Sequence, residues 1–114
     1  MKKYFFLLLG LSVLLSQCKL GNQLFIKLED KSPSKSFGES YDGYMKNGKR
    51  LPSKGKNFEA GSHFLSFFGR NSVHSNLRLN IIKSFDTLYK INPNYKFLYG
   101  ECSWPNGGNF WPHY

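Results

Sequence analysis

Cysteine and histidine are both scarce in this sequence. The two cysteines, Cys18 and Cys102, form no Cys-x-x-Cys pair, which argues against a structural zinc site. Cys102 follows Glu101 and has no neighbouring histidine or basic residue to activate its thiol, which argues against a nucleophilic role. The three histidines are scattered along the chain without the spacing of metal ligands. The residues therefore predict no metal site.

Acidic residues are few compared with basic ones. The sequence has 7 Asp and Glu against 16 Lys and Arg, which gives a net charge of +9. Such a charge is compatible with nucleic acid, an anionic membrane or another anionic polymer as a partner. The basic residues, however, are spread through a polar region rich in glycine and serine: Lys27, Lys31, Lys35, Lys46, Lys49, Arg50, Lys54 and Lys56. This spacing predicts a solvated basic surface and no nucleic-acid partner.

Long apolar runs are lacking as well. The run from Tyr4 to Leu15 follows the positively charged Lys2 and Lys3, and it falls short of the roughly 20 apolar residues that a spanning helix needs. A positive head followed by a short apolar run is typical of a secretory signal peptide. We therefore predict a signal peptide over residues 1–17.

The residues at the end of this run carry a resemblance. Leu14-Leu15-Ser16-Gln17-Cys18 resembles the lipobox of bacterial lipoproteins, in which a signal peptidase cuts before the cysteine and its thiol is acylated. Gln17 departs from the small residue that is usual before the cysteine. The resemblance implies secretion across the inner membrane and a lipid anchor on Cys18 in the bacterial cell envelope. The alternative is an ordinary secreted protein, in which a disulfide between Cys18 and Cys102 becomes possible.

The rest of the chain divides into a tether and one domain. Residues 18–40 are predicted to be a polar tether, because the stretch from Lys31 to Ser36 is rich in serine and lysine. A short apolar patch from Leu24 to Leu28 fits either a strand or part of this tether. Residues 41–114 form the predicted domain, and the aromatic content of 18% supplies material for its core.

The sequence predicts an α+β domain with a small mixed sheet and one main helix, at about residues 75–91. Ser75 is a good N-cap, and Pro93 ends the helix. The apolar stripe of this helix is formed by Leu77, Ile81, Phe85 and Leu88. Strands are predicted over residues 95–99 and over the glycine-bounded residues 61–69.

Several segments of the domain resemble the penicillin-insensitive murein endopeptidases, which are zinc peptidases. They are Gly48 to Pro52, Gly69 to His74, the predicted helix and Glu101 to His113. The most specific is Gly107-Gly108-Asn109-Phe110-Trp111-Pro112-His113. In the family this segment opens a His-x-x-His-x-x-Gly motif that an Asp follows. The second His and the Asp bind zinc, and a later His completes the site.

The resemblance implies a peptidoglycan partner, and a substrate cleft to which Arg70, His74, Glu101 and His113 belong. His113 matches the first His of the motif, which is not a zinc ligand. The sequence contains no His-x-x-His, whereas a catalytic zinc needs three protein ligands and an open position. The expectation is therefore an incomplete domain that ends before the metal-binding motif, holds no zinc as it stands and is inactive.

Two alternatives are left open by the residues. The chain also fits a small basic surface lipoprotein that binds an anionic polymer or a host component without catalysis. His74 also fits a simpler role than cleft residue, which is a hydrogen bond near the start of the predicted helix.

Overall fold

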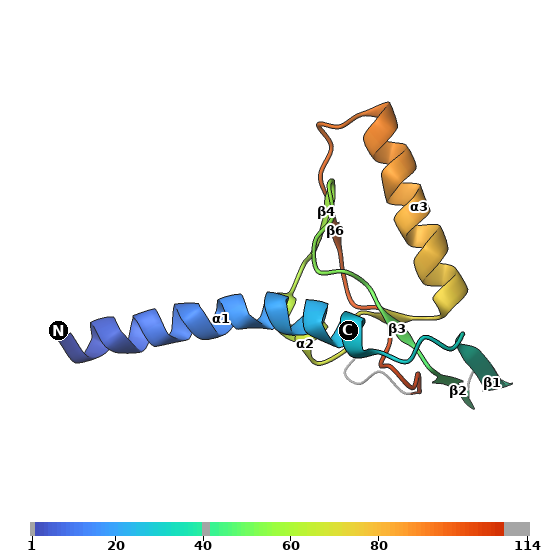
Figure 1. Ribbon diagram of the computed structural model, residues 1–114, viewed down its shortest axis with the longest axis horizontal. Coiled ribbons are helices and arrows are strands. Elements are labelled where there is room, and N and C mark those ends of the chain that lie inside the picture. The colour runs from blue at the N-terminus through green and yellow to red at the C-terminus, as the bar shows by residue number, and fades with distance from the viewer. Residues whose placement is uncertain (1, 40–41, 109–114) are drawn as a thin grey trace.

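A long N-terminal helix is followed by short strands and two further helices, as Figure 1 shows. The computed structural model describes residues 2–39 and 42–108, apart from the side chains of residues 14–16. The elements are α1 (Lys2–Leu28), β1 (Lys35–Glu39), β2 (Asp42–Lys46), β3 (Lys49–Arg50), β4 (Phe58–Ala60), α2 (His63–Phe67), β5 (Ser72–Val73), α3 (Ser75–Ile91) and β6 (Phe97–Tyr99). The predicted α+β class is confirmed.

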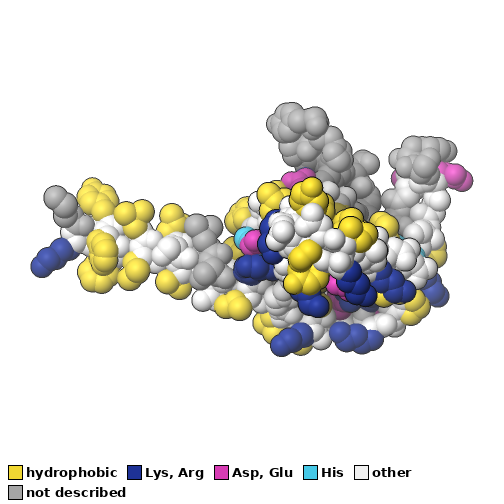
Figure 2. All heavy atoms as spheres, turned by 90° about the horizontal axis from the view of Figure 1, so that it is seen from above, with side chains coloured by type: hydrophobic (Ala, Val, Ile, Leu, Met, Phe, Trp, Pro, Cys, Tyr) yellow, Lys and Arg dark blue, Asp and Glu magenta, His cyan; other side chains and the backbone are white. Residues whose placement is uncertain are grey.

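Helix α1 has two halves with different surroundings. Its first half projects from the rest of the molecule as an arm (Figure 1), and large apolar side chains from Tyr4 to Val13 are exposed along it (Figure 2). Its second half packs against α2 and contains the fully buried Asn22. The helix continues without a break to Leu28. The first part of the expected tether is therefore helical and packed on the domain, and neither a strand nor a linker forms at residues 24–28.

The strands form three separate two-stranded sheets in place of one mixed sheet. β1 and β2 make an antiparallel hairpin, and β3 and β5 are also antiparallel. β4 and β6 are parallel, with Phe58 opposite Phe97 and Ala60 opposite Tyr99. Parallel pairing requires a long crossover connection, which here contains α2, β5 and α3.

Helix α3 has the bounds that the sequence predicts, Ser75 to Ile91. Its N-cap is His74, one residue earlier than the predicted cap, and the His74 Nδ1 atom accepts a hydrogen bond from the Asn76 backbone N–H at 3.3 Å. The structure describes every residue of α3, and none of them is buried. Phe85 and Arg78 both join it to the body. Arg78 Nη1 lies 2.5 Å from Glu29 Oε1. The Phe85 ring stacks on Phe58 at 4.6 Å and lies 5.7 Å from Phe97. We call these three rings the aromatic stack.

The predicted strand over residues 61–69 is wrong, because this segment contains the short helix α2. Ser62 caps the helix, and its hydroxyl accepts a hydrogen bond from the Leu65 backbone N–H at 3.3 Å. Gly69 follows the helix with a φ of +90°, a conformation common just after helix C-termini. The apolar residues at 64, 65, 67 and 68 fit helical spacing as well as a strand, and the cap and the glycine favour the helix.

The interior of the domain is small and largely polar. The buried apolar residues among those described are Leu51, Phe58, Ala60 and Val73. Asn22 donates from Nδ2 to the Leu51 carbonyl oxygen at 3.1 Å, and Asn71 donates to the same oxygen at 2.8 Å. The Asn22 Oδ1 atom accepts from Asn71 and from Arg50 Nη1, each at 3.2 Å. These three residues, Asn22, Arg50 and Asn71, form an asparagine cluster that joins α1 to the domain.

Candidate binding site around Arg70 and Glu101

Two segments that are distant in sequence lie side by side at this site. The Cys102 backbone N–H donates to the Arg70 carbonyl oxygen at 2.8 Å. The Ser72 backbone N–H donates to the Ser103 carbonyl oxygen at 3.1 Å. The fold thus brings two of the four predicted cleft residues, Arg70 and Glu101, into contact.

Arg70 is held by charge and by an aromatic ring. Its Nη2 atom lies 2.6 Å from Glu101 Oε2, a short charge-assisted hydrogen bond. Its guanidinium lies 5.1 Å from the centre of the Trp104 ring, within the range of a cation–π contact. The Arg70 side chain is 13% exposed and that of Glu101 is 34% exposed. The ion pair thus has its acidic partner turned more toward solvent.

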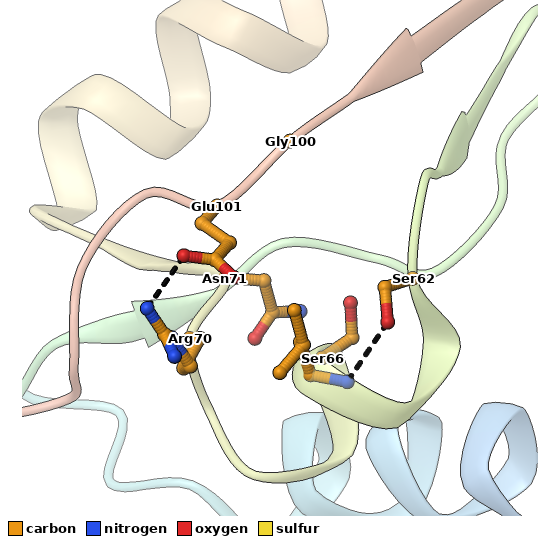
Figure 3. A pocket seen from close by; sticks show the side chains of 7 residues that line it. Ser62, Ser66, Arg70, Asn71, Gly100 and Glu101 are labelled. Carbon is orange, nitrogen blue, oxygen red and sulfur yellow. Dashed lines mark hydrogen bonds and ion pairs between the residues drawn. The ribbon is translucent and has the colours of Figure 1, made fainter. Parts of the chain in front are cut away.

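A small pocket opens beside this ion pair (Figure 3). Its volume is about 40 Å³, which is room for a few water molecules or one small polar group and is far below the roughly 300 Å³ of a typical ligand pocket. Figure 3 shows the Asn71 and Ser66 side chains between the ion pair and Ser62. The lining residues are Ser62, Leu65, Ser66, Arg70, Asn71, Gly100 and Glu101.

Asn71 gives this pocket a buried acceptor. The residue is 1% exposed, and its Nδ2 atom is used within the asparagine cluster. Its Oδ1 atom has no hydrogen-bond partner among the described residues. A buried acceptor of this kind is costly unless a donor meets it. The oxygen itself is shielded from solvent.

Tyr99 is a partly buried and uncharged side chain near this site. Its hydroxyl donates to the Pro52 carbonyl oxygen at 2.8 Å. Burial raises the pKa of Tyr99 above its ordinary value of 10.0, because a phenolate would be poorly solvated there. It therefore acts as a structural donor and not as a base.

The other two predicted cleft residues do not join the ion pair in the part of the chain that is described. His74 is the N-cap of α3 and does not line the pocket, which matches the simpler role that its position in the sequence allows. His113 lies outside the described residues. The sequence reasoning missed Asn71, Ser66 and Ser62, since a buried polar residue leaves no periodic signal; only Asn71 falls within a segment of the resemblance.

His63 belongs to a separate charged cluster. Its Nε2 atom lies 2.9 Å from Glu59 Oε1, and Lys19 Nζ lies 3.4 Å from the same oxygen. The hydrogen bond with His63, and to a lesser extent the one with Lys19, holds the pKa of Glu59 below its usual 4.5. The cluster joins α1 to the start of α2.

The described residues contain neither a group of metal-binding side chains nor a disulfide. Within residues 2–39 and 42–108, no three His, Cys, Asp or Glu side chains are grouped as they would be around a metal ion. Neither Cys18 nor Cys102 takes part in a disulfide among the described residues.

One described helix, α1, is long and apolar enough to cross a membrane, by length and composition. A signal sequence near an N-terminus has the same properties, and the finding is compatible with either role.

Comparison of the whole chain with models of protein families, with curated proteins and with solved structures finds no match.

Proposed function

We propose that this chain is a secreted, lipid-anchored protein similar to the zinc-dependent murein endopeptidases, and that as it stands it binds peptidoglycan without cleaving it. Its anchor is Cys18, and its place is the bacterial cell envelope. The expected lack of cleavage rests on the sequence, which has three histidines and no His-x-x-His pair.

The observation that carries this proposal is the contact between Arg70 and Glu101. The resemblance selects the segments around these two residues independently, because they lie about thirty positions apart in the sequence. Backbone hydrogen bonds align the two segments beside a pocket. An arrangement of this kind is what a shared cleft requires, and it therefore supports the resemblance.

The chemistry of the site fits a peptide better than a sugar. A pocket of about 40 Å³ admits at most one small group, such as a single amide or amino group. At the rim, Arg70 offers a guanidinium to a carboxylate and Glu101 offers a carboxylate to an amino group. The cross-linking peptides of murein carry all three kinds of group.

A sedimentation experiment with isolated murein sacculi tests this proposal. Arg70→Gln is expected to weaken binding roughly tenfold, the effect of losing one charge-assisted hydrogen bond. Lys83→Gln is the matched control, because Lys83 is exposed on α3 and its substitution removes the same charge. Far-ultraviolet circular dichroism checks that both variants keep their helices. Equal binding by the wild type and the Arg70 variant would contradict the proposal.

A second candidate function is favoured by the net charge of +9. A basic surface lipoprotein would bind anionic polymers without a defined site. Its affinity would fall steeply with added salt, because exposed charges are screened beyond about 10 Å at 0.1 M salt. If Arg70→Gln and Lys83→Gln weaken sacculus binding equally, and salt abolishes it, this second function is the correct one.

A further inference from the structure

No flexible linker separates Cys18 from the folded domain. Cys18 lies within α1 and is partly buried. The next residue, Lys19, pairs with Glu59 on β4 at 3.4 Å, and Asn22 one turn later is fully buried. A lipid on Cys18 would therefore hold the domain directly at the bilayer surface, without a flexible linker between them.

An exposed apolar surface lies beside this anchor point. Phe64 on α2 is 55% exposed and Phe68, the C-cap residue of α2, is 53% exposed, and their ring centres are 4.9 Å apart. Phe67 lies 5.4 Å from Phe68 and 5.8 Å from Phe25 of α1, so the rings are continuous between the two helices. On α1, Leu20 and Leu24 are also more than half exposed. We call Leu20, Leu24, Phe25, Phe64 and Phe68 the aromatic patch.

The α1 members of the patch lie within reach of the lipid head groups. An α-helix rises 1.5 Å per residue, so Leu20, Leu24 and Phe25 follow Cys18 within about 10 Å along the helix axis. The polar region of one leaflet is roughly 5–8 Å deep. A modest tilt of α1 is therefore enough to bring the patch against the bilayer.

We propose that the aromatic patch is a membrane-contact surface that docks the domain on an anionic bilayer. This inference rests on the anchoring part of the proposed function and adds a defined orientation to it. Aromatic side chains favour the interface between lipid and water. Lys27, three residues after Leu24 on α1, is exposed and adds a basic group next to the patch.

Charge favours a bilayer over a second copy of the chain as the occupant. Two copies that each carry a net charge of +9 repel one another, whereas anionic head groups attract this surface. The first half of α1 is not needed for the contact, because the patch begins after Cys18. The contact is therefore expected both in a lipidated protein cut before Cys18 and in an uncut protein held by α1.

Photocrosslinking in the membrane tests the proposal. The full chain is produced with its own leader and purified with detergent. It is then reconstituted in vesicles of phosphatidylglycerol and phosphatidylethanolamine, with the photoreactive residue benzoylphenylalanine in place of Phe64 or Phe68. Ile91 is the matched control, because it is apolar, 75% exposed and at the end of α3 far from α1 (Figure 1). Lipid adducts are measured by mass spectrometry.

We expect on the order of tenfold more lipid adduct at positions 64 and 68 than at position 91, since the reaction needs contact with lipid. Equal adduct formation at all three positions, or a crosslinked dimer as the main product, would overturn the proposal. The mass of the N-terminal peptide from the same sample shows independently whether Cys18 is acylated. If lipid adducts form at positions 64 and 68 in a protein whose Cys18 carries no acyl group, the contact surface is supported and the lipid anchor is overturned.

Discussion

Two regions of this protein are held together by different forces. The aromatic stack fixes α3 to β4 and β6 through ring contacts, with Phe58 and Phe85 at 4.6 Å. The asparagine cluster fixes the second half of α1 to β3 and to the residue before β5 through hydrogen bonds that are buried or partly buried. Stacking tolerates small shifts, whereas removing the partner of a buried polar group is costly. The two regions should therefore respond differently to substitution.

The largest effect is expected from Phe58→Ala in the aromatic stack. Phe58 is 9% exposed, and removing a buried ring costs about 3–5 kcal/mol of unfolding free energy. Urea unfolding followed by circular dichroism measures this loss. Leu98→Ala is the control, because Leu98 lies opposite Glu59 in the same sheet and is 77% exposed. A change below about 1 kcal/mol for Phe58→Ala would show that the stack does not hold α3.

A smaller but clear loss is expected from Asn22→Ala in the asparagine cluster. The substitution removes the Asn22 Oδ1 atom, which accepts hydrogen bonds from Arg50 and Asn71. It also removes the Asn22 Nδ2 atom, which donates to Ser53 Oγ at 2.7 Å. Leaving such buried groups unpaired costs about 1–3 kcal/mol. The same urea experiment measures it, with the neighbouring Gln23→Ala as the control. If Asn22→Ala has no effect, water replaces the amide and the contrast between the two regions fails.

The smallest effect is a dependence of stability on pH at the junction of the two regions. Glu59 has its pKa held below the usual 4.5, first by His63 and then by Lys19. A carboxylate with a lowered pKa adds stability above its unfolded pKa and loses it as the pH falls through the folded pKa. We therefore expect the wild type to lose more stability than Glu59→Gln when the pH drops below 4.5. Parallel pH profiles for the two proteins would contradict this.

The sequence predicted α3 because local signals agree there. An apolar stripe at helical spacing, Ser75 and Pro93 all indicate the same helix, and the structure confirms its bounds. The strand near residues 95–99 is also found, as β6. The pairing of β6 with β4 could not be predicted, because β4 has three residues and its partner lies far along the chain.

The errors in the sequence reading have physical causes too. A five-residue helix such as α2 is too short to show a full helical period, so its aromatic residues read as a strand. The stretch after Cys18 was predicted to be part of a polar tether, yet it is helical, and Asn22 within it is buried because hydrogen bonds satisfy its amide. At the site, Arg70 and Glu101 were predicted from the resemblance, whereas the role of Asn71 emerges only from packing.

The parallel pairing of β4 with β6 has a consequence for the order of folding. The two strands enclose residues 61–96, so their contact closes a long loop. Closing such a loop costs conformational entropy before the contact is gained, and contacts of high sequence separation slow the folding of small domains. The β1–β2 hairpin and α3 can form from near neighbours, whereas the β4–β6 contact must wait for the whole crossover. We therefore expect the last strand to dock late and to set the folding rate.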